Sequence, residues 1–190
     1  MNDTTPAAPR VPHGPRYEIG PRLREPAEFL LELLRNRGET LAVAESLTGG
    51  LVLATLTDIP GASDVLRGGV VSYATDLKAG VLDVDAALLA AGGPVQAEVA
   101  AQMAVGVARS CGATWGLATT GVAGPGPADG HPAGTVHVAV AAADDRITPV
   151  TYLDPDLVDL AAAGADRAAV RASSVRAVLR LACDTLHAHM

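Results

Sequence analysis

A polar turn between an apolar strand and a helix carries two hydroxyl side chains at a place where a ligand could bind. Residues 41–44 are small and apolar, which predicts a strand buried on both faces, and an apolar helical pattern resumes over 51–56. Ser46 and Thr48 lie between them, and Gly49-Gly50 lets a ligand approach the backbone closely. The turn therefore falls at the carboxyl edge of a sheet, where open α/β sheets bind ligands. The alternative is that either hydroxyl only caps the helix.

A serine nucleophile needs a neighbouring group that accepts its proton. Lys78 is the only lysine in the chain, and a desolvated lysine can lose its proton where an arginine cannot. A Ser46–Lys78 pair is thus a chemically reasonable way to activate the serine, with Tyr73 relaying the proton or orienting the pair. The alternative for Lys78 is a solvated surface charge, which is the usual place of a lysine.

Two later segments could bind substrate. Residues 121–134 form a Gly- and Pro-rich connection between two strands, longer than most, whose Gly124-Pro125-Gly126 would let the backbone approach a ligand. Arg167 and Arg171 are four residues apart on the last helix and could bind a phosphate together. An ordinary surface connection and ordinary helix charges are the alternatives.

The composition argues against several other classes of protein. Tyr73 and Lys78 are five apart, whereas short-chain dehydrogenases use Tyr-x-x-x-Lys, and no G-x-G-x-x-G follows the first strand. The net charge of −7 argues against a nucleic-acid binder. Cys111 and Cys183 show no metal-type spacing, and we expect no metal or other cofactor. No apolar run reaches about 20 residues and no signal sequence is apparent, so we expect a cytoplasmic protein with no membrane partner.

Strands and helices alternate early in the chain and a hairpin comes late. This order predicts an α/β protein: a three-layer α/β/α sandwich with a mixed, mostly parallel sheet. We expect residues 1–25 to be a flexible extension and 26–190 to be one domain, with a helix that begins near Pro26. The apolar face of that first helix is predicted to be Phe29, Leu30, Leu33 and Leu34. Strands are also expected over 68–73, 115–120, 135–142 and 147–153. Residues 74–78 are expected to be a turn that enters a short helix. Further helices are expected over 83–91, 95–111 and 157–187, the last with a break near Gly164.

Several motifs in a fixed order resemble the C-terminal domain family of CinA, over about residues 26–188. They are Ala44-Glu45-Ser46-Leu47-Thr48-Gly49-Gly50, Ser72-Tyr73 with Lys78, Thr120-Gly121-Val122-Ala123-Gly124-Pro125-Gly126, Gly134-Thr135-Val136, and Asp166-Arg167 with Arg171. Characterised members of that family are nicotinamide-nucleotide amidohydrolases. The resemblance therefore implies hydrolysis of the carboxamide of nicotinamide mononucleotide, giving nicotinate mononucleotide and ammonia, without a metal.

The resemblance also implies roles for individual residues. Ser46 would be the nucleophile, and Lys78 and Tyr73 would transfer protons. The substrate-binding residues would be Glu45, which orients the nucleophile turn, with Thr48, Gly49, Gly50, Thr120, Gly121 and Arg167. Larger relatives carry an additional pyrophosphatase domain, whose activity we expect to be absent here. We also expect homo-oligomers. The alternatives are a catalytically silent nucleotide-binding module and an amidohydrolase of another small amide.

Overall fold

The computed structural model describes residues 20–144 and 146–189. The helices are α1 (Pro21–Arg37), α2 (Leu51–Thr57), α3 (Thr75–Leu82), α4 (Ala86–Gly92), α5 (Ala97–Cys111), α6 (Pro155–Ala162) and α7 (Arg167–Ala188), with a short 3-10 helix at Ala62–Asp64. The strands are β1 (Leu41–Glu45), β2 (Leu66–Val71), β3 (Trp115–Gly121), β4 (Val136–Ala142) and β5 (Val150–Leu153). Within the described ranges no helix is both long and apolar enough to cross a bilayer.

One five-stranded sheet organises the fold, in the order β2-β1-β3-β4-β5. β1 pairs in parallel with β2 and with β3, whereas β4 is antiparallel to both β3 and β5. Four strands therefore run in one direction and β4 alone opposes them, which confirms the predicted mixed sheet. The carboxyl ends of β1, β2 and β3 meet at the same edge.

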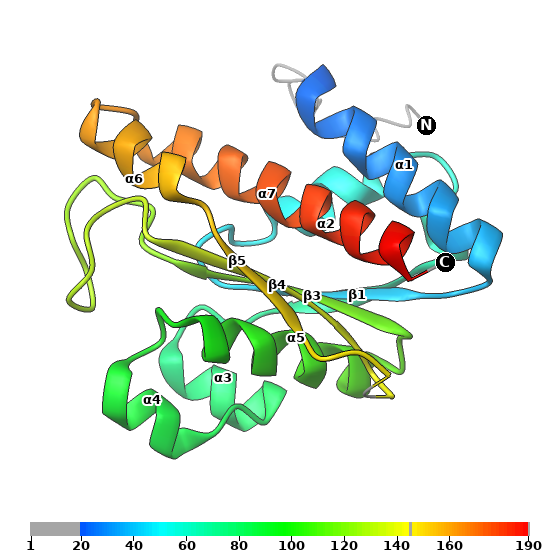
Figure 1. Ribbon diagram of the computed structural model, residues 1–190, viewed down its shortest axis with the longest axis horizontal. Helices are drawn as coiled ribbons and strands as arrows, with labels where there is room; N and C mark the ends of the chain where they lie inside the picture. Colours follow the sequence, from blue (N-terminus) through cyan, green and yellow to red (C-terminus); the bar gives the residue numbers. More distant parts are fainter. Residues whose placement is uncertain (1–19, 145, 190) are drawn as a thin grey trace, which may run out of the picture.

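Helices cover both faces of the sheet, as predicted. Figure 1 shows α1, α2, α6 and α7 over one face and α3, α4 and α5 over the other. Alternate residues of β1 separate the two cores: Leu41 and Val43 pack toward α1 and α7, while Ala42 and Ala44 pack toward α5. The small alanines on the second face let α5 lie close to the sheet.

The first helix begins at Pro21, so the predicted start near Pro26 was wrong. Gly20 is its N-cap, Pro21 is at the first helical position where a missing N–H costs nothing, and Pro26 lies inside the helix. The exposed Phe29 was also wrongly assigned to the buried face, whose spacing runs through Ala27, Leu30, Leu31 and Leu34 instead. Apart from residues 20–25, the predicted N-terminal extension lies outside the described residues.

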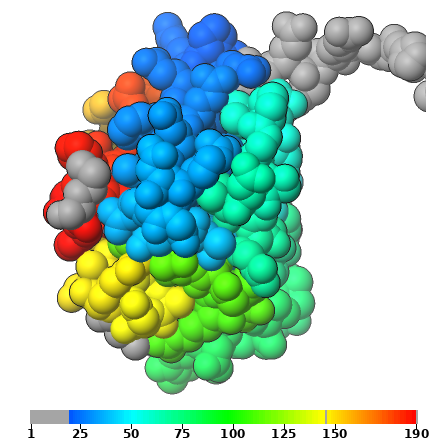
Figure 2. All heavy atoms as spheres, turned by 90° about the vertical axis from the view of Figure 1, so that its right-hand side faces the viewer, coloured from blue at the N-terminus to red at the C-terminus, as the bar shows by residue number. Residues whose placement is uncertain are grey.

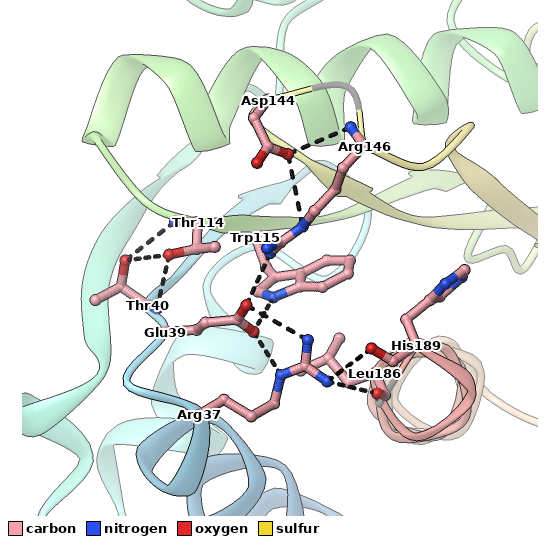
Figure 3. Close-up of polar contacts among 9 residues, drawn as sticks. All are labelled: Arg37, Glu39, Thr40, Thr114, Trp115, Asp144, Arg146, Leu186 and His189. Carbon is pink, nitrogen blue, oxygen red and sulfur yellow. Dashed lines mark hydrogen bonds and ion pairs between the residues drawn. The ribbon is translucent and has the colours of Figure 1, made fainter.

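A charged cluster around Trp115 joins the ends of α1, α7 and the β4–β5 connection at the edge of the sheet opposite to the carboxyl ends of β1–β3 (Figure 3). Glu39 accepts hydrogen bonds from Trp115 Nε1 and Arg37 Nε, each at 2.7 Å, and Arg146 lies 3.0 Å from it. Burial alone would raise the pKa of Glu39, but these hydrogen bonds and arginine charges outweigh burial and lower it. Figure 2 shows this end of the molecule, with α1 in blue above the yellow β4–β5 connection.

The contact between α3 and α5 leaves no room for a side chain at Gly106. A Cβ atom there would overlap the backbone carbonyl of Leu82, the last residue of α3. We expect Gly106→Ala to lower the free energy of unfolding by about 3 kcal/mol, because backbone rather than a flexible side chain must move. Urea denaturation measures this. Gly80→Ala is the matched control: its Cβ would meet nothing within 4 Å, so a gain of about 0.5–1 kcal/mol is expected. Equal effects of the two changes would contradict the argument.

Candidate functional site

Ser46 is the first residue after β1 and lies at the carboxyl edge of the sheet. Its backbone N–H donates to Thr119 O at 3.0 Å, which extends the β1–β3 pairing by one residue and fixes the position of the turn. The alternation along β1 directs the Ser46 side chain to the face covered by α3 and α5. The side chain is only 9% exposed, and it lines a pocket.

Lys78 reaches Ser46 from α3. Its Nζ lies 3.1 Å from Ser46 Oγ and donates to Ser72 O at 2.7 Å. The side chain is 1% exposed, and this burial lowers the Lys78 pKa to about 8, although the charge of Asp129 raises it in the opposite direction. About a tenth of the amine is therefore uncharged at pH 7, within hydrogen-bond reach of a hydroxyl.

Glu45 lies on the other face of the sheet and holds the start of α2. Its carboxylate accepts hydrogen bonds from the backbone N–H groups of Gly50, Val52 and Leu53, at 2.9, 3.1 and 2.9 Å. These are donors that a helix N-terminus leaves without intrahelical partners. A fully buried carboxylate thus fixes the helix relative to the strand, with the Ser46 turn between them.

The rest of the turn is held from the side opposite to the pocket. Thr48 Oγ1 lies 2.7 Å from Thr119 Oγ1, and the Gly49 N–H donates to Ser46 O at 3.1 Å. Arg171 donates from Nε to Leu47 O at 3.1 Å and from a terminal nitrogen to Thr48 O at 2.7 Å. Thr48, Gly49 and Arg171 therefore position the turn, and none of them lines the pocket.

Arg167 connects the last helix to both rims of the pocket. Its two terminal nitrogens donate to Gly124 O at 2.9 Å and to the Tyr73 hydroxyl at 3.0 Å. Asp166 caps the helix just before it by accepting from the Ala169 N–H at 2.8 Å, which fixes the first turn of α7. The guanidinium thus joins the Gly/Pro loop to the residue that precedes α3 by two positions.

The pocket has a volume of about 200 Å³. Besides Ser46 and Lys78 it is lined by Leu47, Tyr73, Thr75, Pro94, Val95, Thr120, Gly121, Val122, Ala123, Gly124, Gly126, Ala128, Asp129 and Arg167. The Thr120 hydroxyl donates to Pro94 O at 2.7 Å, so it is fixed in the wall. Of the residues predicted from the sequence, Ser46, Lys78, Tyr73, Thr120, Gly121 and Arg167 come together here, whereas Glu45, Thr48, Gly49 and Gly50 do not line the pocket.

Asp129 is a pocket residue that the sequence analysis did not single out. The dipeptide Asp129-Gly130 is a strong signal for a tight hairpin turn, which could have located the loop tip but not its contact with the pocket. Across residues 20–144 and 146–189, no group of three or more His, Cys, Asp or Glu side chains is arranged to hold a metal ion.

Comparisons with known proteins agree on one family. The family model described as the CinA C-terminal domain matches residues 23–186. A "CinA-like protein" of Frankia casuarinae is 55% identical over 127 residues, which is 67% of this chain and 29% of that protein. A "putative competence-damage inducible protein" of Desulforamulus reducens is 43% identical over 151 residues, covering 80% of this chain and 34% of the relative. The chain thus spans about a third or less of the length of these relatives.

Solved structures share the fold over nearly the whole chain. The competence/damage inducible protein CihA of Agrobacterium tumefaciens has a TM-score of 0.80 at 29% identity, covering 90% of this chain and 99% of that one. A CinA superfamily protein of Klebsiella pneumoniae has a TM-score of 0.78 at 31% identity, covering 88% of this chain and 99% of its own.

Proposed function

Since the chain belongs to the CinA C-terminal domain family, we propose that it hydrolyses the carboxamide of nicotinamide mononucleotide to nicotinate mononucleotide and ammonia. The observation that carries this proposal is the 3.1 Å separation of Ser46 Oγ and the buried Lys78 Nζ at the wall of a pocket. That is the geometry a hydroxyl nucleophile and its general base require.

The reaction begins with uncharged Lys78 taking the proton of Ser46 Oγ while that oxygen attacks the amide carbon. The tetrahedral intermediate collapses as the Lys78 ammonium returns the proton to the amide nitrogen, and ammonia leaves. Water, deprotonated by the same amine, then hydrolyses the acyl-enzyme and frees Ser46. Ser72 O holds the Lys78 amine in place throughout, because this 2.7 Å hydrogen bond does not involve Ser46.

Other residues bind and orient the substrate in this proposal. Arg167 contacts the phosphate, since its guanidinium lies at the rim and can donate several hydrogen bonds. Tyr73 stands beside it and assists proton transfer. Thr120 and Gly121 form the wall against which the ring lies, while Glu45, Thr48, Gly49 and Gly50 hold the nucleophile turn.

The test is to incubate the purified protein with nicotinamide mononucleotide and measure both products, ammonia and nicotinate mononucleotide. Nicotinamide, nicotinamide riboside and other small amides are supplied in parallel as competing substrates. Faster turnover of another amide would replace the proposed substrate while keeping the reaction type. Nucleotide binding without release of ammonia would instead indicate a silent binding module.

The pH dependence of kcat/KM tests the role of Lys78. Because burial lowers the pKa of Lys78 to about 8 and only the uncharged amine accepts a proton, kcat/KM should fall about tenfold per pH unit well below pH 8. It should level off above that value. Initial rates between pH 6 and 9.5 measure the profile, and a rate that is flat from pH 6 to 9 would contradict a lysine base.

A further inference from the structure

Asp129 lies at the tip of the Gly/Pro loop in a conformation that its own turn imposes. Asp129 and Gly130 both have positive φ, +51° and +77°, as in a type I′ hairpin turn. The turn is closed by two hydrogen bonds between Ala128 and His131, at 3.0 and 2.9 Å. An exposed residue is thus held in a defined place, where it lines the same pocket as Ser46.

The charges around the pocket are few and unequal in kind. Among its described lining residues, Lys78 and Arg167 are the basic side chains, and Asp129 is the only carboxylate. Arg167 is tied to Tyr73 and Gly124 at the rim. The negative charge of Asp129 acts on the buried amine of Lys78, because it raises the Lys78 pKa whereas burial lowers it.

The proposed substrate has charges that match this arrangement. The pyridine ring of nicotinamide mononucleotide is cationic because its nitrogen is glycosylated, and its phosphate is anionic. The product keeps both charges and gains a carboxylate where the uncharged amide was. A negative charge in the pocket wall therefore acts oppositely on the ring and on the new carboxylate.

We propose that Asp129 determines the charge selectivity of the pocket, favouring a cationic ring and disfavouring the acid product. The inference rests on the proposed function, and it adds a specificity-determining residue to it. A carboxylate at this place favours binding of the cationic substrate. It also speeds release of the product, because the reaction itself creates the carboxylate that Asp129 repels.

The experiment measures binding, so that it does not depend on turnover. Calorimetry in the Ser46→Ala background compares nicotinamide mononucleotide, its reduced form with an uncharged dihydropyridine ring, and nicotinate mononucleotide. At pH 9 Lys78 is mostly uncharged. Asp129→Asn should raise the Kd of the cationic nucleotide roughly two- to fivefold, the range for a partly exposed charge pair. The Kd of the reduced form should stay unchanged. The Kd of the acid product should rise less than that of the cationic substrate, because the lost attraction to its ring is offset by the lost repulsion of its carboxylate.

The structure offers close controls. Asparagine keeps the turn, because Asn-Gly is also favoured in type I′ turns. Asp83→Asn removes the same charge at the other described non-glycine residue with positive φ, at +58°, which does not line the pocket; it should change none of the three values. Equal shifts for all three ligands, or none, would overturn the role of Asp129 while leaving the proposed hydrolysis standing. If none of the nucleotides binds and the wild type releases no ammonia, the proposed function itself is contradicted.

Discussion

Replacing Ser46 by alanine is expected to reduce hydrolysis of nicotinamide mononucleotide by at least about 10,000-fold. In the proposed mechanism the variant loses the attacking oxygen, and with it the covalent route, while the pocket walls and Arg167 remain. Binding should therefore persist although turnover does not. The measurement is ammonia release at saturating substrate together with the Kd of the substrate.

Ser72→Ala is the matched control for this change. Ser72 is also buried and its carbonyl holds the same lysine, but its hydroxyl has no hydrogen-bond partner among the described residues. Removing that hydroxyl should leave kcat within about twofold and should not destabilise the fold, because no hydrogen bond is lost. A Ser46→Ala protein as active as Ser72→Ala would exclude Ser46 as the nucleophile.

Lys78→Met is expected to abolish turnover and, at neutral pH, to stabilise the fold. The loss of activity should again reach about 10,000-fold, because the nucleophile and its base act as a unit. The stabilisation has a separate origin. Burial of the lysine lowers its pKa from 10.5 to about 8, and 2.5 units correspond to about 3 kcal/mol that the folded state loses at pH 7.

The sign follows from proton binding. The unfolded chain holds the Lys78 proton up to about pH 10.5, whereas the folded chain releases it above about pH 8. The loss of folding free energy caused by burying the charged lysine is therefore complete below pH 8 and disappears as the pH rises toward 10.5. Methionine removes that cost but leaves Ser72 O without its donor, worth about 1 kcal/mol, so a net gain of about 2 kcal/mol is expected at pH 7.

Urea denaturation of both proteins at pH 7 and pH 10 measures this difference, which should shrink at the higher pH. Lys78→Arg is the control for activity, since it keeps a positive charge and hydrogen-bond donors but cannot give up its proton. It should be as inactive as Lys78→Met. Retained activity in Lys78→Arg would rule out a neutral amine as the base.

Local patterns in the sequence were enough to locate the turn that carries Ser46 and most of the secondary structure. The apolar run 41–44 and the Gly49-Gly50 pair are short-range signals. In the structure the run is part of β1, and α2 begins directly after the two glycines. The start of α1 differs from the prediction because either of two prolines fits a first helical turn, and Pro21 takes that place while Pro26 lies inside the helix. Phe29 is exposed, contrary to the prediction, because spacing alone does not show which apolar residues of α1 the helices α2 and α7 cover.

The composition and the order of motifs in the sequence by themselves determined the layered α/β fold, the family resemblance and Lys78 as a candidate base. Only the tertiary structure decided that the Lys78 amine is buried and lies 3.1 Å from Ser46 Oγ. The two residues are 32 positions apart, and the parallel pairing of β2 with β1 is what brings α3 beside the turn. It likewise decided that Glu45 holds α2 from the other face and that Asp129 joins the pocket wall. Contacts between residues distant in the chain depend on how strands pair and helices pack, and no local pattern of residue types encodes them.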